Sequence, residues 1–332
     1  MRSQGILGRG EQWTLTAANE KPKSGWKGRR LSVFTGRVSA FSIFAPAKLN
    51  LFLAVTGRRA DGFHDLVSVA APLAFGDTLR VERGAVGEFA LGCDDAAVPV
   101  DENNLVLKAV KAFVAATGWK GGAKFFLEKR VPMGAGLGGG SSDGVAALRA
   151  LSALTAEPIS PEAMARMAAG LGSDCSLFLH DGPVVMRGRG ERIEALPAAV
   201  RQRLRGRRVL VFKPGFGIST PWAYAQLAKK APGSYLPAIE AEARLAAWVA
   251  DEKAPAEALL FNNMERAAFA KFIALPALLE RFRGEFGLEP RMSGSGSACF
   301  AFLPAEAPVA AITAAIREAW GATSFVIETR IA

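Results

Sequence analysis

The residues that most clearly indicate chemistry form a glycine-rich segment at positions 131–142, which reads V-P-M-G-A-G-L-G-G-G-S-S. Five glycines within residues 134–140 allow the backbone to turn through positive φ, so its N–H groups can converge on an anion. We expect Ser141 and Ser142 to cap a following helix, whose dipole would also attract phosphate. The segment therefore predicts an enzyme that handles a nucleotide.

A flexible linker is the alternative for a run of glycines taken alone. Residues 123–131 before it have the composition of a strand, and Val145, Leu148, Leu151 and Leu154 after it recur as on one face of a helix. The glycines therefore connect two ordered elements. The segment lacks the G-K-[ST] ending of a P-loop, and no acidic residue follows a second strand at the distance of a dinucleotide fingerprint.

Lys48 and Asn50 lie in a predicted strand, residues 48–55, where alternation puts both side chains on one face. Solvated positions of a half-buried strand are the alternative interpretation. Phe52 and Ala54 continue the same face with apolar side chains, so the face does not simply contact water. The pair is therefore suited to a charged ligand that forms hydrogen bonds.

Asp174 follows the turn at 170–173 and precedes the apolar residues 177–179. It could cap a short helical element, or its carboxylate could accept the proton of a substrate hydroxyl group. A carboxyl group with a reference pKa of about 3.9 is a weak base at neutral pH. It would need a nearby lysine, and we expect Lys48 to be that partner.

Phe63 and His64 end the polar turn at 58–64. An aromatic ring offers a stacking surface for a base, and an imidazole can donate and accept hydrogen bonds at the edge of a base. A core phenylalanine beside a hydrogen-bonded histidine is the alternative when the pair is taken alone.

Length and composition predict a two-domain protein of the cytoplasm. A chain of 332 residues exceeds the size at which one core keeps growing, and half of its residues are apolar. No apolar run is long enough to predict a membrane span. The cysteines, Cys93, Cys175 and Cys299, form no C-x-x-C pair, and with two histidines in the chain we expect neither a disulfide framework nor a histidine-built metal centre.

The net charge of +10 raises the alternative of a nucleic-acid-binding protein. Residues 1–37 contain eight Lys and Arg against two Glu, whereas the remaining 295 residues carry a balance of only +4. This distribution favours an enzyme for anionic substrates over a groove binder. We expect the basic N-terminal segment to be disordered, and its composition is also typical of a transit peptide.

Strands and helices are predicted to alternate in two blocks. The first has a strand at 41–44 that Pro46 ends, then the strand at 48–55, a helix at 105–116, the glycine segment with its helix, and a helix that begins at Ser160 and Pro161. A basic, loop-like stretch at 201–208 separates the blocks. The second has a strand at 209–212, alanine-rich helices, a glycine turn at 293–297, a strand at 298–303, a helix at 308–320 and a last strand. The pattern indicates α+β or α/β architecture.

With these residues in view, the chain resembles the GHMP kinases, which include galactokinase, homoserine kinase, mevalonate kinase and phosphomevalonate kinase. Three segments carry the resemblance, at 45–64, 132–143 and 292–300, with minor echoes at 104–105, 172–174 and 262–265. The second and third segments are common to the family. The first resembles the members of the non-mevalonate isoprenoid pathway, which phosphorylate a cytidylyl-linked methylerythritol.

The resemblance implies an α+β, two-domain GHMP-kinase fold with the active site in the cleft between the domains. The expected parts are a basic extension at 1–38, an ATP-binding α/β domain at 39–205 and a smaller α+β domain at 206–332. The implied cosubstrate and cofactor are ATP and Mg²⁺, and the implied partner is a small cytidylyl substrate whose 2-hydroxyl group accepts the γ-phosphoryl group. We expect no nucleic acid, no membrane, and a monomer or weak homodimer.

The resemblance also implies roles for residues at matching positions. Lys48 and Asp174 would be catalytic, and Ser142 would offer its hydroxyl group to the metal. ATP would be bound by the glycine segment and by Asn104, that is, by Pro132, Met133, Gly134, Ala135, Gly136, Leu137, Gly138, Gly139, Gly140, Ser141, Ser142 and Asn104. The acceptor would be bound by Asn50, Phe63, His64, Thr220, Tyr224, Ser293, Gly294, Ser295 and Gly296.

Two departures from the family pattern concern the site. Phe63 replaces the usual tyrosine, which keeps a stacking ring and removes one hydroxyl group. The segment 172–176 reads Gly-Ser-Asp-Cys-Ser where the family has Gly-Ala-Asp-Val-Pro, so the acid remains while its backbone surroundings change. Another GHMP kinase, of the homoserine or mevalonate type, is the alternative within the family.

Overall fold

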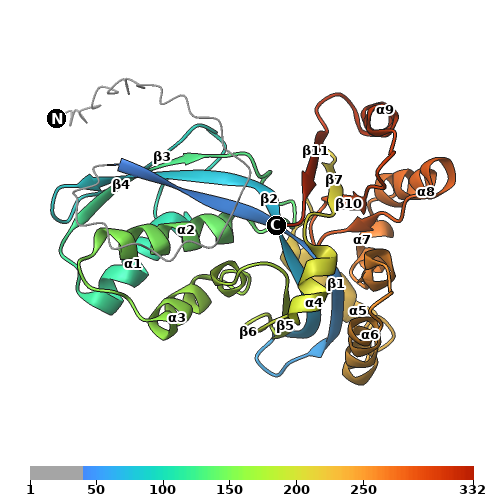
Figure 1. Ribbon diagram of the computed structural model, residues 1–332, viewed down its shortest axis with the longest axis horizontal. Coiled ribbons are helices and arrows are strands. Elements are labelled where there is room, and N and C mark those ends of the chain that lie inside the picture. Colours follow the sequence, from blue (N-terminus) through green and yellow to red (C-terminus); the bar gives the residue numbers. More distant parts are fainter. Residues whose placement is uncertain (1–39) are drawn as a thin grey trace, which may run out of the picture. The chain divides into compact units, whose positions relative to one another are not determined.

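The computed structural model describes residues 40–332, and the predicted disorder of residues 1–38 lies outside this range. The described chain forms two sheets (Figure 1). The first has seven strands: β3 (Phe89–Cys93), β4 (Gly122–Glu128), β2 (His64–Gly84), β1 (Ala40–Arg58) and β8 (Phe261–Asn262) in this order, with β5 (Val184–Gly188) on β2 and β6 (Arg192–Ala195) on β5. The second has four strands, in the order β11 (Phe325–Arg330), β7 (Arg208–Lys213), β10 (Cys299–Phe302) and β9 (Arg291–Met292).

The long antiparallel pair β1 and β2 forms the centre of the first sheet. The prediction that Pro46 ends a strand is wrong, because β1 continues through it to Arg58. Pro46 lies opposite Gly76, and the pairing register shifts between Pro46 and Lys48. A β-bulge of this kind accommodates a residue that has no N–H group to donate. The bulge immediately precedes Lys48, a predicted catalytic residue.

The helices α1 (Leu105–Thr117) and α2 (Gly139–Leu154) pack on the first sheet, and α3 (Pro161–Leu171) packs on these two helices (Figure 1). Val145, Leu148, Leu151 and Leu154 are all buried, as their spacing predicts. Ser160 accepts a hydrogen bond from the N–H group of Ala163, so the predicted start of α3 is confirmed. A 3₁₀ turn at Ser176–Leu179 then leads to β5.

The second sheet packs against helices from the C-terminal half of the chain. These are α5 (Thr220–Lys229), α7 (Glu265–Phe269), α8 (Ala274–Phe286) and α9 (Val309–Trp320), whose apolar residues form one core with Phe212 of β7. The helix α6 (Ala238–Ala250), followed by a 3₁₀ turn at Ala256–Leu259, packs instead on β1 and β2. The prediction of a loop at 201–208 is wrong in part, because residues up to Leu204 belong to the helix α4 (Ala198–Leu204). Burial of Val200 and Leu204 stabilises this helix.

One apolar cluster joins the two sheets. It contains Leu49 and Leu51 of β1, Val211 of β7 and Phe300 of β10, all fully buried, together with Trp248 of α6. The sheets therefore share a core, and β1 is a wall of it. The other face of β1 is left to support the site.

Candidate active site

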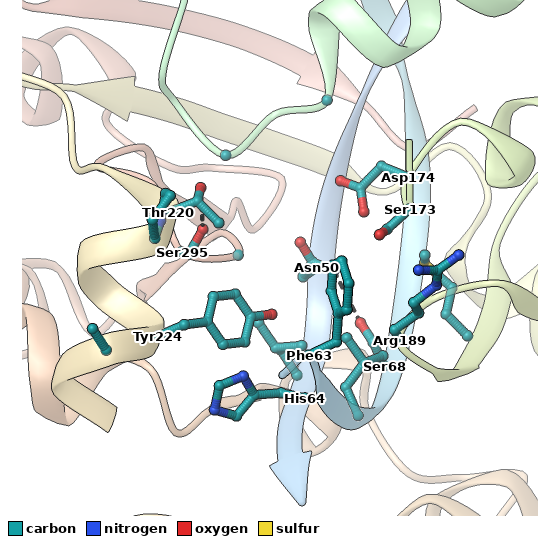
Figure 2. A pocket seen from close by; sticks show the side chains of 18 of the residues that line it. Asn50, Phe63, His64, Ser68, Ser173, Asp174, Arg189, Thr220, Tyr224 and Ser295 are labelled. Atoms are coloured by element: carbon teal, nitrogen blue, oxygen red, sulfur yellow. Dashed lines mark hydrogen bonds between the residues drawn. The ribbon is translucent and has the colours of Figure 1, made fainter. Parts of the chain in front are cut away.

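A cavity of about 880 Å³ lies between the glycine segment and the turn that joins β1 to β2 (Figure 2). Gly136, Gly138 and Ser141 line one end, and Phe63 and Tyr224 line the other. Lys48, Asn50 and Asp174 lie along the same cavity, and so do Thr220, Gly294 and Ser295. The structure thus brings together predicted residues that are more than 200 positions apart in the sequence.

Lys48 and Asp174 form an ion pair in which the Lys48 Nζ atom lies 3.3 Å from the Asp174 carboxylate. The Lys48 side chain is 4% exposed, whereas that of Asp174 is 40% exposed. Lys48 also donates from its Nζ atom to Asn50 Oδ1 at 2.5 Å. A buried ammonium group therefore holds two oxygen atoms, one of them on a carboxylate that opens to the cavity.

The amide of Asn50 has its orientation fixed by its neighbours. Its Nδ2 atom donates to Ser68 Oγ at 2.9 Å, and Ser68 Oγ donates in turn to the carbonyl of Phe52 at 2.7 Å. Only Oδ1 can then face Lys48. Ser68 also lines the cavity. It was not predicted from the sequence, because it lies in the apolar strand β2 and belongs to no motif.

The glycine segment adopts the left-handed backbone that its composition predicts. Gly134, Gly136 and Gly138 have φ values of 63°, 82° and 73°. The prediction that Ser141 and Ser142 cap the next helix is wrong, because α2 already begins at Gly139 with Gly138 as its cap. The positive φ of Gly138 lets the helix begin before the serines. Both serines therefore lie in its first turn, Ser141 at the cavity and Ser142 buried.

The second glycine turn, at 293–296, lies directly against the first. A Cβ atom on Gly296 would come within 2.2 Å of the carbonyl carbon of Ala135, and one on Gly136 within 2.3 Å of the Ser293 carbonyl oxygen. Ala298 donates its N–H group to the carbonyl of Ala135 at 3.0 Å, and Thr220 and Ser295 share a hydrogen bond between their hydroxyl groups at 2.8 Å. Two backbones thus meet where side chains would not fit.

The remaining predicted nucleotide residues lie outside this cavity. Asn104 caps α1, because its Oδ1 accepts from the N–H group of Val106 and its Nδ2 donates to the carbonyl of Pro99. Met133 is 46% exposed and does not line the cavity. The cavity therefore contacts only part of the segment 132–142.

Four side chains form the aromatic end of the cavity. His64 and Tyr224 have ring centroids 4.9 Å apart, and the guanidinium group of Arg189 lies 5.0 Å over the ring of Phe63. In Figure 2 the Phe63 ring lies between Tyr224 and Arg189. Burial lowers the pKa of His64, and the charge of Arg58 adds to the effect, so the imidazole is neutral at pH 7. Burial, with the nearby charge of Asp174, raises the pKa of Tyr224 to about 12, so its hydroxyl group keeps its proton.

Arg189 is a site residue that the sequence analysis missed. It lies between Gly188 and Gly190, whose φ values are 67° and 114°. That pair of glycines was the available signal, since it predicts a tight turn between β5 and β6. Nothing in the sequence indicates that the turn reaches Phe63.

A buried charge network lies beneath the glycine segment. Lys129 Nζ contacts the carboxylates of Asp77 at 2.6 Å and of Asp143 at 2.7 Å, and a Cβ atom on Gly139 would lie 3.0 Å from the same Nζ. Burial raises the pKa of Asp143 to about 7; Lys129 opposes the shift and the charge of Asp77 adds to it. Asp143 Oδ1 and Ser142 Oγ are buried without a hydrogen-bond partner in the described part of the chain.

Comparisons with known proteins identify the fold and the family. Residues 104–182 match the model of the GHMP kinases N terminal domain. A 4-diphosphocytidyl-2-C-methyl-D-erythritol kinase of Methylacidiphilum infernorum is 39% identical over 269 residues, which are 80% of this chain and 87% of the relative. A crystal structure of 4-(cytidine 5'-diphospho)-2C-methyl-D-erythritol kinase is 35% identical, with a TM-score of 0.69, and covers 87% of this chain and 99% of that one.

A homoserine kinase from Cytophaga hutchinsonii has a TM-score of 0.67 at 18% identity, over 90% of this chain and 96% of that one, and shares the fold alone. The fold is that of a GHMP kinase, which confirms the predicted α+β fold class. Within that class, the chain belongs to the family of 4-diphosphocytidyl-2-C-methyl-D-erythritol kinases. Across residues 40–332, none of the helices has the length and apolar character that a membrane span requires.

Proposed function

We propose that this chain transfers the γ-phosphoryl group of ATP to the 2-hydroxyl group of 4-diphosphocytidyl-2-C-methyl-D-erythritol. The observation that carries the proposal is the common cavity of the Lys48–Asp174 pair, the glycine segment and the aromatic residues. Family membership supports the same reaction. A phosphate-binding loop at one end and a stacking surface at the other suit an acceptor that carries a base.

Asp174 and Lys48 would act on the acceptor hydroxyl group. The Asp174 carboxylate, which opens to the cavity, would orient the hydroxyl group and accept its proton. Lys48 would stabilise the negative charge that develops on the attacking oxygen, and its burial strengthens that effect. Phosphoryl transfer demands little covalent chemistry from the protein, so positioning and charge account for most of the catalysis.

The glycine segment would bind the phosphates of ATP through backbone N–H groups at the positive end of α2. Mg²⁺ fits this end of the helix, because Ser142 Oγ and Asp143 Oδ1 are buried oxygens without partners within the described chain, and Mg²⁺ binds oxygen ligands. Ser142 would hold the ion, with Asp143 as the neighbouring carboxylate. When bound, Mg²⁺ would neutralise charge on the transferred group.

The acceptor would bind through its base and its polyol. Phe63 and Tyr224 would stack on the cytosine, and His64 would form hydrogen bonds with its edge. Asn50 would contact the polyol through the oxygen that also faces Lys48. Thr220 and the turn at 293–296 would close the side of the cavity next to the phosphates.

We also propose the domain boundaries 39–205 and 206–332. Six of the seven strands of the first sheet lie within residues 40–195, and the four strands of the second sheet lie within residues 208–330. We propose the reducing cytoplasm as its location, which the free cysteines of the described chain support. A monomer or weak homodimer is our proposal for its assembly. Sedimentation at micromolar concentration tests that assembly, and a stable larger oligomer would contradict it.

The experiment that tests the function measures ADP release with three acceptors. We expect turnover with the cytidylyl substrate and none above background with homoserine or mevalonate. An Asp174→Asn variant is the matched control for contaminating kinases. Turnover on homoserine or mevalonate in place of the cytidylyl compound would identify another GHMP activity.

A further inference from the structure

Two consecutive asparagines, Asn262 and Asn263, lie where the later half of the chain meets β1. They begin the segment 262–265, one of the minor echoes of the family pattern. Asn262 ends β8, which pairs in parallel with Phe52 and Leu53 of β1. Asn263 follows, and its N–H group donates to the carbonyl of Leu53 at 3.2 Å. The two side chains therefore start from the same point of β1, and their contacts lead to different parts of the site.

The buried amide of Asn262 holds the second glycine turn. Its Nδ2 atom donates to the carbonyls of Met292 and Gly294, both at 2.8 Å. Glu265, from the same segment, accepts a hydrogen bond from the N–H group of Met292 at 2.8 Å. The backbone on both sides of Ser293 is therefore held by side chains of the segment 262–265.

This turn in turn supports Lys48 and Asn50. Asn50 donates its N–H group to Ser293 Oγ at 3.2 Å, and Ser293 Oγ donates to the carbonyl of Gly136 at 3.3 Å. A Cβ atom on Gly294 would lie 3.0 Å from Asn50 Oδ1 and 3.5 Å from Lys48 Nζ. The position of the turn therefore sets how closely its backbone approaches the ammonium group of Lys48.

Asn263 holds the end of β1 and the loop that packs on His64. Its Oδ1 atom accepts from the N–H group of Val55 at 2.9 Å, and its Nδ2 atom donates to the carbonyls of Val55 at 2.8 Å and of Ser234 at 3.1 Å. Ser234 precedes Tyr235, whose ring centroid lies 5.9 Å from that of His64. One amide thus fixes both the strand that leads to the His64 turn and the loop whose ring packs on the imidazole.

We propose that Asn262 and Asn263 are positioning residues that fix two parts of the cavity separately. Asn262 sets the second glycine turn against Lys48 and so serves phosphoryl transfer, since a misplacement of about 1 Å can lower a rate about 10²-fold. Asn263 sets the surroundings of His64 and so serves binding of the acceptor. The link to these ligands rests on the proposed function, whereas the separation of the two roles rests on the hydrogen bonds alone.

Asn262→Asp and Asn263→Asp test the proposal as a matched pair. Both are isosteric, and each replaces an Nδ2 donor with a carboxylate oxygen that faces two carbonyls. We expect Asn262→Asp to lower kcat roughly tenfold and to leave the KM for the cytidylyl substrate within about threefold. We expect Asn263→Asp to raise that KM roughly fivefold and to leave kcat within about twofold.

Steady-state kinetics and thermal unfolding distinguish positioning from a purely structural role. A structural role would lower the melting temperature in both variants without the split between kcat and KM. The proposal is overturned if both variants change the same constant, or if neither variant changes any. If an aspartate variant does not fold, serine at the same position takes its place with the same expectations, because it removes the amide and adds no charge.

The imidazole signals of His64 test the separation without substrate. The chain has two histidines, and the exposed His180 is the internal reference, which a His180→Gln variant assigns. We expect the His64 signals in ¹H–¹³C spectra to shift in Asn263→Asp and to stay within the line width in Asn262→Asp. Unchanged His64 signals in Asn263→Asp contradict the proposal. Absence of turnover on the cytidylyl substrate in the wild type refutes the proposed function instead, and leaves the spectroscopic result standing.

Discussion

The two ends of the cavity are built from different material. At the end proposed to bind phosphate, here the phosphate end, two glycine turns present backbone, and the added Cβ of Gly296 would overlap the carbonyl carbon of Ala135. At the end proposed to bind the base, here the base end, the surface consists of side chains, with Phe63 and Tyr224 facing the cavity and Arg189 over Phe63. Geometry at the first end is set by φ and by close backbone approach, whereas at the second it is set by which side chains pack together.

This difference predicts how each end tolerates change. A backbone-built end has no alternative rotamers, so any side chain added there displaces the main chain. A side-chain-built end can exchange one aromatic ring for another of similar size with little strain. Substitutions at the phosphate end should therefore change stability and nucleotide affinity together, and those at the base end should change the KM for the acceptor alone.

The largest effect is expected where the two ends meet. Asp174→Asn should lower kcat by at least about 10²-fold, the lower range for an acid–base group, because the amide cannot accept the proton. The KM for ATP and for the acceptor should change little, and so should the melting temperature, since Asp174 is 40% exposed. Steady-state kinetics measure kcat and the two KM values, and thermal unfolding measures the melting temperature. Asp181→Asn, at an exposed position outside the cavity lining, is the control. A kcat near that of the wild type would reduce Asp174 to a structural residue.

Gly296→Ala tests the backbone-built end. The new Cβ atom would lie 2.2 Å from the Ala135 carbonyl carbon, so the two turns must separate. We expect a loss of about 1–3 kcal/mol in the free energy of unfolding and a roughly tenfold higher KM for ATP. Gly215→Ala is the matched control, because its Cβ atom would contact nothing within 4 Å. Equal stability of the two variants would mean that the turns are not locked together.

His64→Ala tests the side-chain-built end. It should raise the KM for the cytidylyl substrate roughly five- to tenfold, as the loss of one buried hydrogen bond implies, and leave the KM for ATP unchanged. Kinetics with each substrate varied in turn separate the two constants. If the two KM values rise together, the ends are coupled and the comparison fails.

The smallest effect is a pH dependence at the base end. Burial and the charge of Arg58 lower the pKa of His64 from its ordinary value of 6.5. The imidazole is therefore still mostly neutral when the pH falls to 6.5. The KM for the acceptor should be flat from pH 8 to 6.5 and rise a few-fold at lower pH, as protonation removes one mode of hydrogen bonding. The rise should be absent in His64→Gln. A rise that begins above pH 6.5 would show that another group titrates.

Local signals in the sequence predicted much of the backbone conformation at and near the phosphate end. The glycines of the segment required positive φ, and Ser160 with Pro161 marked the start of α3. The cap of α2 was misplaced because Gly138 can begin a helix without a side-chain hydrogen bond. The prediction that the strand ends at Pro46 was wrong, because a β-bulge next to the Pro46–Gly76 pair accommodates the proline within β1. In both cases backbone freedom at glycine overrode the usual preference of the neighbouring residue.

At the base end, the residues themselves pointed only to Phe63 and His64, and the family resemblance supplied Thr220 and Tyr224. Phe63 and His64 are adjacent, but Arg189 comes from a different hairpin and Tyr235 from a loop after α5. No periodicity or spacing relates residues that meet through the tertiary structure. The charge network of Asp77, Lys129 and Asp143 was missed for the same reason, since its members come from β2, the loop after β4 and α2.

The short strand β8 bears on how the protein melts. It belongs to the later half of the chain, yet it pairs in parallel with Phe52 and Leu53 of β1. Asn262 in this strand also donates to the carbonyls of Met292 and Gly294, and the apolar cluster at Leu49 and Val211 spans both sheets. Neither sheet retains its full set of neighbours once the other is lost. Heat should therefore unfold the enzyme in one cooperative step, with a calorimetric enthalpy equal to the van't Hoff enthalpy.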